Sequence, residues 1–338
     1  MTEAKSHTRL DAAIPVLICI DVEPDARFIR PGHPIPWRGY EHAVAIFGRF
    51  RTRASAISGV PAHFTWVYRM DPQVALGYGS ASWVLAHYDR ETSGLADAGD
   101  DLGLHTHAYR WSDRKQRWML PLDDQAWVEE CLTTAAAAFE GSLGRPCHTF
   151  RSGDHWMNQA TMDLLGRLGA RYDLTLEPGH PSAPVSRVSE GSGVLPDYSG
   201  VPEMPYRPSR ADYRLPDPLR EDGLILIPMT TAAVRPRLLR DLYDLASHRG
   251  KRSKRWTAIL SHDPVLFRRI ITDALQRRNA PHLGLPVRSG ALAEPRFAAR
   301  VADNLEWMLS HPLGERFRWS TPDETMQRWA SPPRAGSF

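Results

Sequence analysis

The sequence of 338 residues predicts an α/β fold built on a parallel sheet. Strand-like and helix-like segments alternate through its first half, as in parallel strands joined by crossover helices. The length suits one domain of barrel size, and neither an internal repeat nor a linker divides the chain. Hydrophobic residues make up 42% and charged residues 24%, which is ordinary for a globular protein. We therefore expect residues 1–338 to form a single domain.

The first half of the chain carries the clearest element signals. Its first expected strand, VLICID, is a continuous apolar run rich in branched side chains, typical of a strand buried on both faces. Its strongest expected helix, residues 123–144, begins with acidic residues and ends in glycine. In chain order we expect strands at 16–21, 63–68, 101–107, 147–151 and 171–175, and helices at 40–57, 80–99, 123–144 and 158–169.

The middle of the chain changes in composition. Residues 176–222 are rich in Pro, Gly and Ser, which predicts a long loop or a small β insertion over one face of the fold. Beyond this segment the element signals return. We expect strands at 223–230 and 282–288, helices at 236–248, 264–278 and 296–311, and a closing strand and turn at 316–324.

Charge and cysteine usage exclude several classes of protein. The net charge of +3 gives no reason to expect a nucleic-acid partner, and the basic run at 249–255 is interpreted as a solvated loop. The three cysteines have no metal-type spacing and no disulfide pattern. Neither a signal peptide nor a transmembrane window is recognisable. We expect a cytoplasmic protein without stable membrane insertion, and leave its oligomeric state open.

Polar side chains follow the ends of several expected strands. Asp21 and Glu23 end the first strand, His105 and His107 end the third, and Arg151 ends the fourth. In parallel α/β folds these ends share one edge, where active sites form. Imidazoles plus a carboxylate suit a divalent cation, and a second carboxylate can act as general base on water. A lone His-x-His pair is weak evidence, but its combination with IDVE is much stronger.

Three stretches together resemble a known family. VLICIDVEPD, DLGLHTHAYRW and FRSGDHWMNQATMDLLGRLGARYDLTLEPG resemble, in order and spacing, the motifs of the NodB-homology polysaccharide deacetylases, carbohydrate esterase family four in the broad sense. The resemblance covers about residues 14–180, and the last helix and strand are also similar. It implies a distorted (β/α) barrel with fewer than eight regular units.

The resemblance also implies roles for the polar residues. Asp21 would be the catalytic base, and Glu23 and His105 would bind one divalent metal ion. The family's second histidine usually lies four residues after the first, where this chain has a tyrosine, so His107 is taken as the third ligand. Arg151 would orient the base or support the oxyanion. Zn²⁺ is the first choice of ion, with Co²⁺, Ni²⁺ and Mn²⁺ open.

The sequence offers more than one residue as the general acid. Arg288 stands at the end of the late strand, where the family usually offers a histidine. His262, in AILSHDP, follows an apolar run and is the best substitute by context. The same stretch also resembles a helix start, with Ser261 or Asp263 as the cap and Pro264 in the first turn. Asp154 and His155 are the other candidates.

Four residues are expected to contact the substrate: Tyr109, Asp154, Trp156 and Tyr206. Trp156 would wall the acyl pocket, and Tyr206 has an alternative interpretation as loop structure. The leading hypothesis is a metal-dependent hydrolase that removes an N-acetyl group from an amino sugar in surface polysaccharide or lipopolysaccharide biosynthesis. A deformylase or another amide hydrolase would use the same groups. A non-catalytic saccharide-binding protein is the third hypothesis, supported by the missing late-strand histidine.

Overall fold

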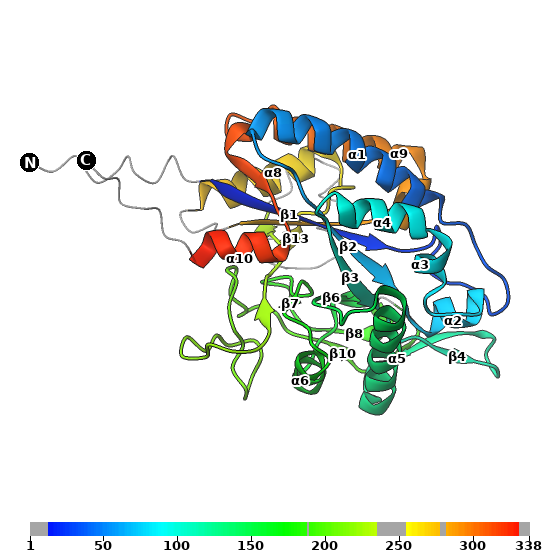
Figure 1. The fold of residues 1–338 in the computed structure, drawn as a ribbon. Coiled ribbons are helices and arrows are strands. Elements are labelled where there is room, and N and C mark those ends of the chain that lie inside the picture. Colours follow the sequence, from blue (N-terminus) through cyan, green and yellow to red (C-terminus); the bar gives the residue numbers. More distant parts are fainter. Residues whose placement is uncertain (1–12, 188, 235–254, 278–281, 331–338) are drawn as a thin grey trace, which may run out of the picture.

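A computed structural model describes residues 13–187, 189–234, 255–277 and 282–330 (Figure 1). Its strands are β1 (Ile14–Val22), β2 (Thr65–Arg69), β3 (Asp101–Thr106), β4 (Arg110–Ser112), β5 (Arg117–Pro121), β6 (Thr149–Ser152), β7 (Tyr172–Asp173), β8 (Ala183–Pro184), β9 (Gly191–Ser192), β10 (Val194–Leu195), β11 (Ile225–Leu226), β12 (Thr231–Ala233), β13 (Arg255–Thr257), β14 (Leu283–Arg288) and β15 (Phe317–Trp319). Its α-helices are α1 (Arg38–Ser58), α2 (Pro72–Tyr78), α3 (Trp83–His87), α4 (Asp89–Asp97), α5 (Gln125–Leu143), α6 (Gln159–Arg167), α8 (Pro264–Gln276), α9 (Pro295–Leu309) and α10 (Pro322–Ala330). Short 3₁₀ turns are η1 (Gly153–His155), η2 (Val185–Arg187), η3 (Ser289–Ala293) and η4 (Gly314–Arg316).

One parallel sheet organises the molecule. Its strand order is β11-β7-β6-β3-β2-β1-β14, and β15 also pairs with β1. Every pairing within it is parallel, so the carboxyl ends of the strands meet along one edge. The fold is a distorted (β/α) barrel, a curled sheet covered by helices, as the sequence predicts. This edge is where β1, β3, β6 and β14 present their last residues.

The core lies between the sheet and its helices. The side chains of β1 from Val16 to Ile20 are completely buried, which explains its uninterrupted apolar sequence. Helix α1 turns an apolar stripe toward the core, and α1 packs against α9 above β1 in the view of Figure 1. Helix α5 packs against β3, farther along the same helix-covered face of the sheet. Burial of each large apolar side chain contributes about 1.5–3 kcal/mol, so this packing fixes the sheet edge.

Several predicted elements differ in detail. The single helix expected at 80–99 is wrong: the chain forms two helices there, α3 and α4, because Tyr88 between them has a non-helical backbone. The strand expected at 223–230 is reduced to β11 and a loop leading to β12. The closing turn is the start of a further helix, α10. The described part of the segment at 176–222 contains the two-residue strands β8, β9 and β10 and the 3₁₀ turn η2. The helix expected at 236–248 lies outside the described residues.

Candidate metal centre

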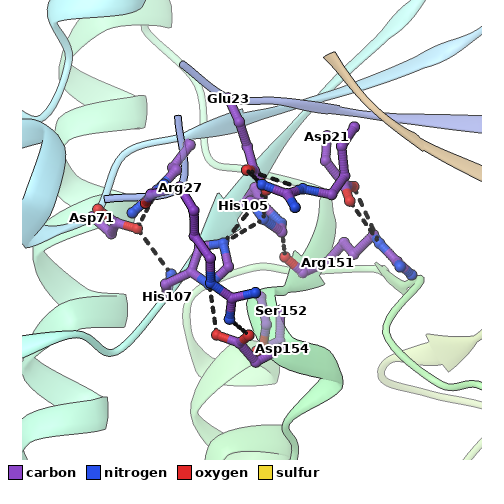
Figure 2. A network of polar contacts seen from close by, with 12 residues as sticks. Asp21, Glu23, Arg27, Asp71, His105, His107, Arg151, Ser152 and Asp154 are labelled. Atoms are coloured by element: carbon purple, nitrogen blue, oxygen red, sulfur yellow. Dashed lines mark hydrogen bonds and ion pairs between the residues drawn. The ribbon is translucent and has the colours of Figure 1, made fainter. Parts of the chain in front are cut away.

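Three side chains converge at the carboxyl edge of the sheet (Figure 2). Glu23 follows β1, while His105 and His107 lie at and just beyond the end of β3. The Nε2 atoms of the two histidines are 3.1 Å apart, and they lie 3.2 and 3.5 Å from Glu23 Oε1. All three side chains are buried. Because β3 stays extended through Thr106, residues two apart bring both imidazoles to the same side.

The hydrogen bonds of the rings determine what this cluster can bind. His105 Nδ1 lies 2.8 Å from the carbonyl oxygen of Arg151, which can only accept, so this nitrogen carries the proton. His107 Nδ1 lies 2.8 Å from an oxygen of Asp154 and donates in the same way. In the neutral rings both Nε2 atoms are then acceptors, and they face a third acceptor, Glu23 Oε1. Three converging hydrogen-bond acceptors repel one another unless a cation lies among them. These three atoms therefore suit the coordination of a divalent metal ion.

A short strained loop, residues 153–155, supports the ring of His107. Asp154 has φ 55° and His155 has φ 54°, a backbone conformation that non-glycine residues rarely adopt. This geometry turns the Asp154 carboxylate toward His107 and toward the guanidinium of Arg27, with which it forms an ion pair. Burial alone would raise the pKa of Asp154, but His107 and Arg27 hold it well below its usual value. Gly153 lies against the His107 ring, where a Cβ atom would come within 2.2 Å of Nδ1.

The proposed base lies beside the three converging groups. Asp21 precedes Glu23 by two residues, and its Oδ1 forms an ion pair with Arg151 Nε at a distance of 3.1 Å. The same guanidinium donates to the carbonyl of Leu174 at 2.5 Å and to Glu177 at 3.3 Å. Burial alone would lower the pKa of Arg151, but the charges of Asp21 and Glu177 outweigh burial and hold that pKa above its usual value. The guanidinium is therefore permanently charged. Arg151 therefore fixes the position of the Asp21 carboxylate.

Arg288 ends β14 opposite Asp21 in the strand register. Its Nη2 and Nε bind Glu23 Oε2 at 2.6 and 3.2 Å, while Oε1 faces the histidines. Burial alone would raise the pKa of Glu23, but Arg288 and the two histidines hold it well below the usual value. The carboxylate is therefore charged and has one oxygen directed at the candidate ion.

The residues expected to contact the substrate are mostly buried or already paired with other protein groups. Tyr109 is fully buried, stacks on His107 at 5.5 Å and accepts a hydrogen bond from Arg27 at 2.6 Å. Asp154 is occupied by His107 and Arg27. Trp156 lines a small cavity behind the sheet edge, and none of the three converging residues lines that cavity. Tyr206 is buried and donates to the carbonyl of Tyr213.

The backbone around His262 follows β14. Ala258 N donates to Thr230 O, Thr230 N donates to Gly284 O, and Leu260 N donates to Pro286 O. The segment therefore advances in the direction of β14, toward the edge where that strand ends. Asp263 caps α8 by accepting from Val265 N at 3.0 Å, as the capping interpretation expects. The ring of His262 contacts Trp256 edge to face.

Four polar residues of this region are missing from the sequence-based site: Arg27, Arg69, Asp71 and Glu177. Asp71 accepts from the His107 backbone N–H at 3.2 Å, pairs with Arg69 at 2.6 Å and caps α2. Glu177 contacts Arg151 and lies 2.9 Å from His155 Nδ1. Glu177 follows shortly after β7, so the rule of strand ends would have found it. Arg69 ends β2 and Asp71 follows it, so the same rule would have found both. Nothing local in the sequence marks Arg27, which acts through partners distant along the chain.

Comparisons with known proteins bear on the fold. No protein-family model matches the sequence, and no curated protein matches it. A structure provisionally described as a polysaccharide deacetylase, from Mycobacterium smegmatis, is 13% identical, with a TM-score of 0.47 over 97% of this chain and 95% of that one. One provisionally described as a glycoside hydrolase/deacetylase, from Parabacteroides distasonis, is 9% identical, with a TM-score of 0.57 over 95% of this chain and 72% of that one. Puue allantoinase is 12% identical, with a TM-score of 0.51 over 96% and 92%.

The chain has the NodB-type deacetylase fold. In this NodB-type fold the converging groups come from strands far apart in the sequence, and only the parallel pairing of β1, β3, β6 and β14 brings them to one edge. No helix among the described residues is long and apolar enough to cross a membrane.

Proposed function

We propose that this protein is a metal-dependent hydrolase that removes an N-acetyl group from an amino sugar. The observation that carries the proposal is the convergence of Glu23, His105 and His107 beside an arginine-bound carboxylate, Asp21. Fold neighbours described as a deacetylase and as an allantoinase support hydrolysis as the class of reaction. Synthesis of a surface polysaccharide or lipopolysaccharide is the proposed setting.

Each group has a distinct task in this proposal. A divalent cation, with Zn²⁺ as first choice, would be held by Glu23, His105 and His107 and would supply Lewis acidity to the amide carbonyl and the attacking water. Asp21 takes a proton from that water, and Arg151 holds the Asp21 carboxylate in position. Asp154 keeps the His107 ring oriented with Nε2 toward the centre.

We further propose that His262 protonates the leaving amine. Support comes from its backbone, which follows β14 toward the edge that ends at Arg288. The carbonyl of His262 is also bound by Asn304, a buried residue of α9, which fixes the start of α8. Arg288 itself is always charged and cannot supply this proton.

Replacement of Asp21 by asparagine tests the proposal. This substitution keeps the shape of the side chain but removes the base, so turnover should fall by about 10²–10⁴-fold while bound metal is retained. Acetate release from N-acetylated amino sugars is followed by mass spectrometry, together with metal content. The exposed Asp97→Asn variant is the matched control and should keep wild-type turnover. Absence of acyl release from any probe with any cation would contradict the proposal.

A second candidate is hydrolysis of a formyl group or of a non-sugar amide by the same residues. The allantoinase among the fold neighbours favours this alternative, because its name refers to a substrate that is not a saccharide. Parallel assays with formylated and acetylated amino sugars and with small cyclic amides separate the two. A preference for N-acetyl sugars would exclude the alternative.

A further inference from the structure

Arg288 is unusually exposed for a residue bound to a buried carboxylate. Its side chain is 44% exposed, whereas that of its partner Glu23 is only 2% exposed. The bonds to Glu23 use Nε and Nη2, so the Nη1 edge of the guanidinium remains for another ligand. A planar guanidinium with a free edge is well suited to bind a phosphate or carboxylate group.

Arg27 repeats this arrangement at a second buried carboxylate. Its side chain is 31% exposed over Asp154, which is 5% exposed. Burial alone would lower the pKa of Arg27, but the charge of Asp154 outweighs burial and holds that pKa above its usual value. Two partly exposed guanidinium groups are thus each paired with a buried carboxylate, and both carboxylates contact His107, at 2.8 Å from Asp154 and 3.5 Å from Glu23.

The charge balance of the centre changes when a metal ion binds. Five acidic groups are buried here, namely Asp21, Glu23, Asp71, Asp154 and Glu177, and four arginines neutralise them in part, namely Arg27, Arg69, Arg151 and Arg288. With neutral histidines, the sum is one negative charge, and a divalent cation turns it into one positive charge. Arg69 and Arg151 are enclosed, so Arg27 and Arg288 are the arginines of this set that offer positive charge to a ligand.

We propose that the substrate carries an anionic group, phosphate or carboxylate, close to the acyl-amino group, and that Arg288 together with Arg27 binds this anion. The inference rests on the proposed hydrolase function and narrows its substrate class. It gives Arg288 a role in specificity beyond its contact with Glu23. A neutral sugar would leave both guanidinium edges to water and gain nothing from them.

The test compares three probes with the zinc-loaded full chain: N-acetylglucosamine, N-acetylglucosamine 1-phosphate and N-acetylmuramic acid. We expect kcat/KM for at least one anionic probe to exceed that for the neutral sugar about tenfold or more, with an advantage that shrinks as salt is raised. The phosphate and carboxylate probes distinguish the two sources of negative charge. Equal kcat/KM for all three probes would overturn the inference while leaving the hydrolase function intact.

Arg288→Gln separates anion binding from support of Glu23. The advantage of the anionic probe should fall about tenfold in this variant, mainly through KM, with zinc content retained. The Arg53→Gln variant, which breaks an exposed ion pair with Glu306, is the matched control and should keep the advantage. An equal loss on all probes, or loss of zinc, would show that Arg288 acts only on Glu23.

A binding measurement decides the inference if wild-type protein deacetylates none of the probes. Inorganic phosphate is then titrated calorimetrically into the zinc-loaded protein. Phosphate binding that weakens about tenfold or more in Arg288→Gln supports the anion site even though the proposed reaction fails. Phosphate binding that is absent, or unchanged by the substitution, overturns it.

Discussion

Each histidine of the candidate centre is oriented by a hydrogen bond from Nδ1, and its Nε2 faces the position expected for the metal ion. His105 is fixed by a backbone carbonyl and His107 by a carboxylate, so the two rings have the same tautomer for different reasons. The carboxylate is the stronger partner, because its charge raises the electron density available on the opposite nitrogen. We therefore expect the two ligands to contribute unequally to metal affinity.

Removal of either imidazole should remove the metal ion. We predict that His105→Ala and His107→Ala each lower zinc affinity more than about 100-fold, since loss of a direct ligand costs more than loss of an outer partner. Elemental analysis and competition with a chelating dye measure this. His33→Ala, at an exposed histidine, should bind zinc as the wild type does. Full zinc content in His105→Ala would refute the ligand set.

At the scale of elements, the loop that begins with Gly153 leaves no room for a larger side chain beside His107. It connects β6 to α6 and carries Asp154 to His107. Glycine is needed at 153 because the imidazole of His107 occupies the space of a side chain. The loop thus couples the end of β6 to the ligand at the end of β3.

Gly153→Ala should displace His107 without unfolding the protein. An added Cβ would come within 2.2 Å of Nδ1, so the ring must shift, and zinc affinity should fall about 10–100-fold. Helical content by circular dichroism should stay unchanged. Gly141→Ala in α5, where a Cβ meets open space, is the control and should leave zinc affinity intact. Wild-type zinc affinity in Gly153→Ala would show that the ring tolerates the methyl group.

The elements divide into those that sequence predicts and those that it does not. Strand β1, helix α1, helix α5 and strand β14 were predicted closely, because continuous apolar runs or regular helical spacing mark them. The hairpin of β4 and β5 was missed, since its pattern of apolar residues is short and interrupted by charges.

The residues of the site also divide into those that the sequence pattern predicts and those that it does not. Asp21, Glu23, His105, His107 and Arg151 follow strand ends and could be predicted to lie together. Asp71, just beyond the end of β2, could have been found by the same rule, whereas Arg27 could not, because its role depends on contacts across the fold. The expectation that Tyr109 contacts substrate remains a prediction, although its burial shows that it supports His107.

At the scale of the whole molecule, stability should depend on pH through a buried histidine away from the site. His282, at the start of β14, lies 2.8 Å from the Pro228 carbonyl, and burial lowers its pKa to about 4. A histidine with a lowered pKa in the folded state favours folding above pH 6.5. This contribution is lost as pH falls from 6.5 to 4, because the unfolded chain binds the proton first.

The wild type should therefore lose up to about 3 kcal/mol of unfolding free energy from this group between pH 7 and 4. His282→Gln keeps a donor for the carbonyl but cannot titrate, so its loss over the same range should be smaller. Urea unfolding at pH 7 and 4.5 gives the comparison, with His33→Gln as a control that retains the wild-type dependence. Identical pH dependence in His282→Gln and wild type would exclude His282 as the cause.

Arg151 supports the centre with two chemically different parts of one residue. Its main-chain carbonyl orients His105, and its side chain holds Asp21. The carbonyl survives any substitution, whereas the guanidinium does not. A library of variants at this single position would therefore vary the environment of the proposed base while the support of the candidate metal ligand His105 stays constant. Position 151 is thus a natural place to tune reactivity by directed evolution without redesigning the candidate metal centre.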